Sequence, residues 1–166
     1  MEGLADAYEE LANYEIKSEG IAVHTLTPKL KRLRKLTSVS LPTADLPVDP
    51  TCKYKDILSI EEFQPTFQLV GGIHLPKLVT CVGSDGRMHK QLVKSKDDLR
   101  QDAVMQQIFL LVNTLLRENH ETRVRNLCIR TYHVVPLTPT SGLLEWVENT
   151  VSLKAYLVGD KFNCFN

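Results

Sequence analysis

The chain has 166 residues, 43% of them hydrophobic and 24% charged, which is enough to bury the core of one domain. Its 20 Lys and Arg balance its 20 Asp and Glu, so net charge gives no general attraction to nucleic acid or to an anionic membrane surface. The four cysteines have no Cys-x-x-Cys spacing, which argues against a zinc site and favours reduced intracellular thiols. The N-terminus lacks a signal-peptide pattern, and no apolar run approaches the ~20 residues of a membrane span.

The first third of the chain predicts a helix and a connector. Apolar residues recur at helical spacing over residues 4–19, which predicts a helix that ends at Gly20. Prolines interrupt residues 21–56, so we expect a connector there. Its basic run, residues 29–35, is interpreted as a solvated linker beside a packed lobe. A nuclear-import signal or a phosphate-binding patch is the alternative interpretation.

From Ile57 the pattern changes to short strands separated by turns. Gly83-Ser84-Asp85-Gly86 has the composition of a turn, so the strands on either side of it should form a hairpin. The predicted strands cover residues 63–70, which end at Gly71-Gly72, and residues 78–82, 88–94, 127–135 and 142–147.

Residues 97–119 give the strongest helix prediction. Two neighbouring apolar stripes form a wide apolar face, which we expect to pack on a sheet. Ser95 or Asp97 can cap the start of this helix, where acidic residues suit its positive end. The complete pattern predicts an α+β fold: an antiparallel sheet of about five strands with one long helix, preceded by a helix and a linker.

Lys94 ends an apolar strand, and acidic residues follow it at once. A half-buried ammonium group needs an anion, and Asp97 and Asp102 are the nearby candidates. Kinases use this arrangement to hold nucleotide phosphate, with a strand lysine that is itself held by a helix carboxylate. From spacing alone, an ordinary surface lysine at the end of a strand is an equally good interpretation.

The turn at residues 83–86 lies just before the strand that carries Lys94. Its glycines allow backbone N–H groups to approach a phosphate closely. Any tight hairpin turn has this composition, and the pattern is neither Gly-x-Gly-x-x-Gly nor a Walker A loop. The turn alone is therefore a weak indication of phosphate binding.

Tyr132 and Trp146 are candidates for the wall of a purine site, which needs a flat apolar surface. A core position is at least as good an interpretation for both aromatic residues. The histidines are not spaced as metal ligands, and we expect four of them at the surface or at sheet edges: His74, His89, His120 and His133.

Several motifs together resemble the kinase N-lobe of the phosphatidylinositol 3-kinase-related protein kinases. Within that family they are most similar to the branch that acts in DNA-damage signalling. The similarity is close over residues 57–158 and looser over residues 1–56. The motifs are Lys94–Asp102 with its intact Asp-Leu-Arg-Gln-Asp, Gly71–Lys77, Cys81–Gly86, Thr131–Leu137 and Gly142–Trp146.

The resemblance implies a phosphate-binding role for several residues. Lys94 would contact the ATP phosphates, while Asp97 and Asp102 would pair with it or orient it. The phosphate-covering loop would consist of Gly83, Ser84 and Asp85.

The resemblance also implies an adenine pocket. Backbone groups of a hinge would bond adenine, and an indole ring would pack against it. The pocket would be formed by Tyr132 on its inner side, Leu92 as its roof, Glu145, Trp146 and Val147 as the hinge, and Thr150 near the ribose.

The resemblance further implies a division of the chain. Residues 1–20 would be the end of a FAT-like helical region, 21–56 a linker, 57–158 a partial kinase N-lobe and 159–166 a divergent tail. The family continues into a C-lobe that carries the catalytic loop and the metal site, so we expect neither catalytic residues nor metal ligands in this chain. ATP with Mg²⁺ or Mn²⁺ would serve the parent, whereas the chain alone should be inactive and bind ATP weakly or not at all.

The leading hypothesis is the ATP-binding portion of a nuclear serine/threonine protein kinase. Its partners would be ATP, protein substrates and the missing C-lobe. The parent would be a homodimer recruited to DNA breaks through other proteins, with no membrane association. A phosphoinositide lipid kinase fragment is one alternative, because those enzymes share Asp-Leu-Arg-Gln-Asp. A non-catalytic interaction module with exposed apolar surface is the other.

Overall fold

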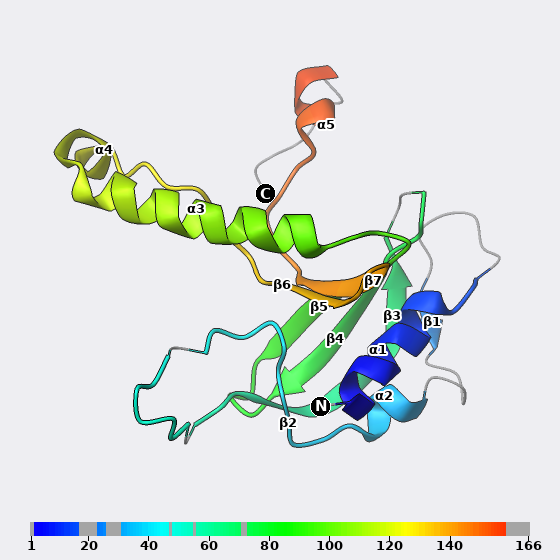
Figure 1. Cartoon of the computed structure of the whole chain (residues 1–166). Helices are drawn as coiled ribbons and strands as arrows, with labels where there is room; N and C mark the ends of the chain where they lie inside the picture. The colour runs from blue at the N-terminus through cyan, green and yellow to red at the C-terminus, as the bar shows by residue number, and fades with distance from the viewer. Residues whose placement is uncertain are drawn as a thin grey trace.

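The computed structural model describes residues 2–16, 23–25, 31–46, 48–54, 56–70 and 73–158. Figure 1 shows a central sheet, with two N-terminal helices on one side of it and the long helix on the other side. The N-terminal helices therefore share one body with the sheet.

The sheet has seven strands in the described part of the chain, in the order β1-β3-β4-β5-β7-β6, with β2 also paired to β3. All pairs are antiparallel, which confirms the predicted α+β fold. The two additional strands lie in the predicted connector and are too short to show an alternating pattern. The strands are β1 (Val23–Thr25), β2 (Val39–Ser40), β3 (Ser59–Leu69), β4 (Lys77–Gly83), β5 (Met88–Ser95), β6 (Val134–Thr138) and β7 (Ser141–Glu145).

One face of the sheet, which we call the back face, carries the buried side chains of Val79, Val93 and Leu143. Two helices cover it, α1 (Glu2–Asn13) and α2 (Lys31–Lys35). Apolar residues from both helices enter the same hydrophobic core as the strands. Burying one large apolar side chain contributes about 1.5–3 kcal/mol, so this face anchors the N-terminal segments.

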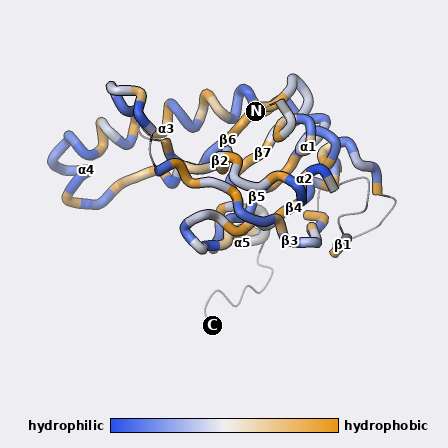
Figure 2. Tube along the Cα trace, turned by 90° about the horizontal axis from the view of Figure 1, so that it is seen from below, coloured by the Kyte–Doolittle hydropathy of each residue, from blue (hydrophilic) through white to orange (hydrophobic). Residues whose placement is uncertain are grey.

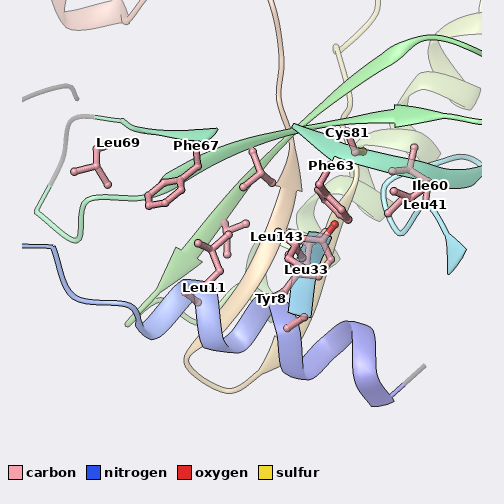
Figure 3. Packing of buried hydrophobic residues seen from close by; sticks show 14 residues of the cluster. Tyr8, Leu11, Leu33, Leu41, Ile60, Phe63, Phe67, Leu69, Cys81 and Leu143 are labelled. Carbon is pink, nitrogen blue, oxygen red and sulfur yellow. The ribbon is translucent and has the colours of Figure 1, made fainter. Parts of the chain in front are cut away.

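The core is centred on α1. Tyr8 and Leu11 are fully buried and point from the helix toward the sheet, as Figure 3 shows. The ring of Tyr8 meets Phe63 edge to face, with 6.1 Å between the ring centroids. The predicted helical stripe is therefore confirmed as the sheet-facing side of α1.

The helix α1 ends at Asn13, so the predicted extension to residue 19 is wrong for the described residues 14–16. Gly20, the predicted stop, lies outside the described residues. The Nζ atom of Lys77 on β4 donates a hydrogen bond of 2.7 Å to the backbone carbonyl of Ala12. This buried ammonium satisfies one of the carbonyl groups that the end of a helix leaves without a partner.

Residues 31–35 of the basic run form α2, and residues 29 and 30 lie outside the described residues. Leu33 is buried in the core, whereas Arg32, Arg34 and Lys35 are exposed. This arrangement agrees with the interpretation of a solvated segment beside a packed lobe. The alternative roles in nuclear import and phosphate binding stay predictions.

The long helix α3 (Arg100–Glu118) is confirmed, but its apolar face packs on the sheet along only part of its length. Figure 2 shows hydrophobic residues recurring along α3, which extends past the strands. The prediction that α3 packs on the sheet is confirmed for part of its length, and the rest of its apolar side is exposed. The exposed apolar residues of α3 are Val104, Met105, Ile108, Leu110, Leu111 and Leu115.

The predicted strand over residues 127–135 begins only at Val134. The preceding segment runs beside α3 and is held by its polar side chains. The amide of Asn113 brackets Ile129, accepting from its N–H at 2.7 Å and donating to its carbonyl at 2.8 Å. Gln106 accepts from the N–H of Tyr132 at 3.1 Å. Side chains of the helix thus replace the strand partners that we expected.

Two short helices complete the description, α4 (His120–Val124) and α5 (Leu153–Val158). Asn119 caps α4 by accepting hydrogen bonds from two backbone N–H groups. No helix in the described residues is both long and apolar enough to cross a membrane.

Candidate nucleotide-binding site

The face of the sheet opposite α1, which we call the open face, carries Lys94 and an apolar row. Leu92 is the register partner of both Leu78 on β4 and Leu144 on β7. Directly paired residues of antiparallel strands point to the same side, so these three side chains lie next to one another. Lys94 follows two residues after Leu92 and points to the same face. The sheet thus places the ammonium group of Lys94 beside an apolar surface.

Lys94 pairs with the first of its two predicted partners. Its Nζ atom lies 3.1 Å from Oδ2 of Asp97, and both side chains are partly exposed. Such a pair contributes about 0–1 kcal/mol, so it orients the ammonium rather than stabilising the fold. No hydrogen bond or ion pair in the described residues joins Lys94 to Asp102. An ammonium group has three donors, so Lys94 keeps capacity for a further anion.

The start of α3 is organised by Asp98, and the predicted capping by Ser95 or Asp97 is wrong. The position before the helix is Leu99, which provides no side-chain cap. Asp98 accepts from the backbone N–H of Arg100 at 3.1 Å and from its guanidinium at 2.7 and 2.8 Å. These hydrogen bonds, first those of the guanidinium, lower the pKa of Asp98 to about 2. The carboxylate therefore stays charged beside the first turn of α3.

The turn at residues 83–86 lies at the opposite end of β5 from Lys94. It joins β4 to the first residues of β5, whereas Lys94 is near the last, about 20 Å away at ~3.3 Å per residue. Ser84 is tied to Ser59 on β3 by hydrogen bonds of 2.8 and 3.1 Å. Asp85 accepts from the N–H of Arg87 and contacts His89. This geometry does not agree with the expectation that Gly83, Ser84 and Asp85 cover a phosphate held by Lys94.

A different loop lies at the Lys94 end of the sheet. It joins Leu69 on β3 to Lys77 on β4, and Lys77 is the register partner of Val93. A hydrogen bond of 2.8 Å from the N–H of Val70 to the carbonyl of Pro76 closes the loop. Residues 73–76 of this loop belong to the described chain, whereas the two glycines before them do not.

The predicted hinge follows β7. The N–H of Glu145 donates to the carbonyl of His133 at 2.8 Å, and the N–H of Trp146 donates to that of Lys90 at 3.0 Å. No hydrogen bond within the described residues uses the N–H of Val147, and its carbonyl accepts from the hydroxyl of Thr150 at 3.3 Å. The first backbone donor open to a ligand is therefore that of Val147.

Two predicted pocket residues lie outside the leucine row of the open face. Glu145 pairs in register with Gln91, so its side chain lies on the back face, away from the open face. Tyr132 is half-buried and lines a cavity of about 400 Å³ between α3 and the start of β6. The structure thus brings together Lys94, Asp97 and Leu92, but not the turn at residues 83–86.

Sequence reasoning missed a cluster behind the hinge. His133 contacts Glu145 at 2.7 Å through Nδ1 and Asp45 at 2.9 Å through Nε2. We expected this histidine at the surface, and its side chain is partly exposed. Because Asp45 lies far away in the sequence, no local signal could have identified this contact.

Residues 89–163 match the family described as Phosphatidylinositol 3- and 4-kinase. Over 96% of its length the chain is 48% identical to the serine-protein kinase ATM of Sus scrofa and 43% identical to the serine/threonine-protein kinase ATM of Arabidopsis thaliana. A solved structure of the FAT and kinase domain of CtTel1 matches 93% of the chain with a TM-score of 0.81 and 39% identity. The chain belongs to the phosphatidylinositol 3-kinase-related protein kinase family.

The chain spans a small part of these phosphatidylinositol 3-kinase-related kinases. It covers 5% of the Sus scrofa protein, 4% of the Arabidopsis thaliana protein and 12% of the CtTel1 FAT and kinase chain. The matched portion is the N-lobe region of the kinase domain. The relatives are named as protein kinases, whereas the matched family description covers lipid kinases.

The described residues do not contain a group of three or more His, Cys, Asp or Glu side chains that could hold a metal ion. Lys94 and the apolar row suit the phosphates and the base of a nucleotide, but they provide no set of carboxylates for a divalent cation. The residues present thus fit a nucleotide and do not fit its metal ion.

Proposed function

We propose that this chain is the ATP-binding N-lobe portion of an ATM-like serine/threonine protein kinase that acts in DNA-damage signalling. The single observation that carries the proposal is the position of Lys94. It lies on the open face beside Leu92, with Asp97 holding its ammonium at 3.1 Å. A positioned cation next to an apolar surface is the arrangement that a nucleotide requires.

Each part of the nucleotide has a proposed partner. Lys94 bonds the phosphates, and the row of Leu78, Leu92 and Leu144 covers the adenine ring. The free N–H of Val147 bonds the edge of adenine, while Thr150, which is tied to the carbonyl of Val147, lies near the ribose. Tyr132 and Trp146 line the deeper and outer parts of this pocket.

The loop that covers the phosphates is proposed to include residues 73–76. Strand register supports this choice, because the loop joins two strands at the end of the sheet where Lys94 lies. The turn of Gly83, Ser84 and Asp85 lies at the far end, and its polar groups are already bonded within the sheet.

In the parent enzyme, Mg²⁺ or Mn²⁺ would neutralise phosphate charge during transfer of the ATP γ-phosphate to a protein hydroxyl. This chain would contribute binding and orientation: Lys94 fixes the phosphates, and Asp97 fixes Lys94.

Further proposals concern the parent. One CtTel1 structure is titled as a dimer with C2 symmetry, which supports a homodimeric parent. The kinship with ATM supports a nuclear location and recruitment to DNA breaks by other proteins. We also propose the division into a FAT-like end at 1–20, a linker at 21–56, an N-lobe at 57–158 and a tail at 159–166. The tail lies outside the described residues.

A second candidate function is a non-catalytic interaction module. The observation that favours it is the exposed apolar side of α3, which includes Met105, Leu111 and Leu115. Exposed apolar surface of this kind promotes association. Sedimentation velocity of the wild-type chain and Leu111→Glu tests this candidate, because a concentration-dependent complex that the substitution abolishes would support it.

The ATP-binding proposal is tested with an acyl-phosphate derivative of ATP, whose acyl group is transferred to an amine held beside the phosphates. We expect Lys94 to be acylated, and excess ATP to protect it. Lys96, two residues away and exposed, is the matched control and should react slowly and without protection. Equal labelling of both lysines, with no effect of ATP, would contradict the proposal.

A further inference from the structure

Two side chains of the connector reach the back of the strands that lead into the hinge. The amide Nε2 of Gln91 on β5 donates to the hydroxyl of Thr43 at 3.0 Å. Two residues further along the connector, Asp45 bonds His133. Gln91 and Glu145 are register partners, so both contacts meet the same part of the sheet. The connector is thus fastened directly behind the end of β7.

His133 and Glu145 hold one another by three hydrogen bonds. The backbone N–H of His133 donates to Oε2 of Glu145 at 3.1 Å, and its Nδ1 lies 2.7 Å from the same oxygen. In return the N–H of Glu145 donates to the carbonyl of His133 at 2.8 Å. With Asp45 at Nε2, both ring nitrogens face a carboxylate. Both can donate only when the imidazole carries two protons.

The surroundings of His133 favour the protonated ring. Cavities of about 560 and 400 Å³ flank it, and their other ionisable lining residues are Asp56, His89 and Tyr132. The helix α3 contributes neutral residues to this lining. Partial burial lowers the pKa of His133, but the hydrogen bonds that its ring makes to Glu145 and Asp45 outweigh this effect, so the pKa lies above its ordinary value.

We propose that His133 is a positioning residue for the hinge. Its imidazolium joins Asp45 of the connector to Glu145, the last residue of β7, and thereby fixes the backbone that continues into Val147. When the ring loses a proton, one carboxylate loses its donor, and the link from Asp45 through the ring to Glu145 is broken, although the contact between Thr43 and Gln91 remains. This inference rests on the proposed function, because the hinge is where adenine is proposed to bind. Loss of the proton from His133 would make the position of the hinge sensitive to pH near neutrality.

The test follows nuclear magnetic resonance signals of the 166-residue chain from about pH 5.5 to about pH 8.5, without nucleotide. We expect the amide of Val147 to shift with the same midpoint as the ring of His133, above the ordinary value of ~6.5. His133→Gln should abolish the shift. His89→Gln, which removes the other histidine of the larger cavity, should preserve it. A Val147 signal that is independent of pH, or that titrates unchanged in His133→Gln, would overturn the proposal.

A second variant keeps the test decisive if His133→Gln fails to fold. Asp45 is 94% exposed, so Asp45→Asn should leave the fold intact. It removes one of the two carboxylates, and we expect the midpoints of both His133 and Val147 to move together toward the ordinary value. A midpoint equal to that of the wild-type chain would count against His133 as the link between Asp45 and Glu145. Because the readout contains no nucleotide, failure here leaves the ATP-binding proposal standing.

Discussion

The phenol of Tyr8 donates a hydrogen bond to the amide oxygen of Gln91, and this contact joins α1 to the strand that carries Lys94. Both side chains are fully buried. Gln91 in turn donates to Thr43, so one polar chain crosses the core from α1 to the connector. A buried polar group that loses its partner costs about 1–3 kcal/mol, which makes this contact specific for the docked position of α1.

Tyr8→Phe should therefore lower the free energy of unfolding by about 1–3 kcal/mol, because the amide oxygen of Gln91 then lacks a donor. Urea denaturation measures the change. Tyr14→Phe is the matched control, since the hydroxyl of Tyr14 makes no hydrogen bond within the described residues. If both variants lower the free energy of unfolding by the same amount, the hydrogen bond to Gln91 does not contribute specifically to stability.

Asn113→Ala should loosen the segment before β6. The amide of Asn113 makes two hydrogen bonds with the backbone of Ile129, and we expect a loss of about 1–3 kcal/mol in local stability. Hydrogen exchange at the amide of Ile129 should become faster. Thr114→Ala, at the exposed neighbouring position, should leave that exchange rate unchanged. If the exchange rate at Ile129 is unchanged in Asn113→Ala, the two hydrogen bonds from Asn113 do not hold this segment in place.

Cys81 should be the unreactive thiol of the described chain. Burial, followed by the charge of Asp85, raises the pKa of Cys81 to about 12, whereas Cys52 and Cys128 are exposed. Native alkylation near pH 8, read by mass spectrometry of peptides, should modify Cys52 and Cys128 and spare Cys81. Modification of Cys81 at the rate of Cys52 would show that the core opens.

The same pKa shift predicts a dependence of stability on pH. An unfolded thiol ionises near ~8.5, whereas the folded thiol of Cys81 stays neutral up to about 12. Its contribution is complete below the unfolded pKa and is lost as pH rises above it. Urea denaturation at increasing alkaline pH should show less decline for Cys81→Ala than for the wild-type chain. Parallel declines would assign the effect to other groups.

Arg100→Gln should raise the pKa of Asp98 from about 2 toward its ordinary value of ~3.9, because the guanidinium hydrogen bonds are lost. The stabilising effect of this carboxylate is present above the unfolded pKa and is lost as pH falls toward about 2. Carboxyl carbon shifts during an acid titration measure the midpoint. An unchanged midpoint would mean that the backbone N–H of Arg100 alone holds the carboxylate.

The local features of this fold were predictable because their signals are local. The hairpin of β4 and β5 follows from two alternating runs around a glycine turn, and α3 follows from a long apolar period. The two short strands β1 and β2 were not predicted because they have no sequence pattern of their own. Only their pairing with β3 defines them. The resemblance to a longer kinase led us to expect exposed apolar surface, and α3 carries it, but an apolar stripe alone does not reveal which of its residues the chain itself covers.

The site shows the same division. The pairing of Lys94 with Asp97 follows from a spacing of three residues. The turn at residues 83–86 is close to Lys94 in sequence but not in space. The length of β5 separates them. The contact of Asp45 with His133 joins residues from distant segments, which only the folded sheet brings together.

The open face is tested most directly as the nucleotide site by titrating the 166-residue chain with ATP and following amide chemical shifts up to high nucleotide concentration. We expect weak binding, with shifts at Leu92, Lys94 and Val147 and none in the turn at residues 83–86. Lys94→Met should remove these shifts, and Lys96→Met should keep them. Shifts centred on the turn, or shifts of equal size in Lys94→Met, would contradict the assignment of the open face as the nucleotide site.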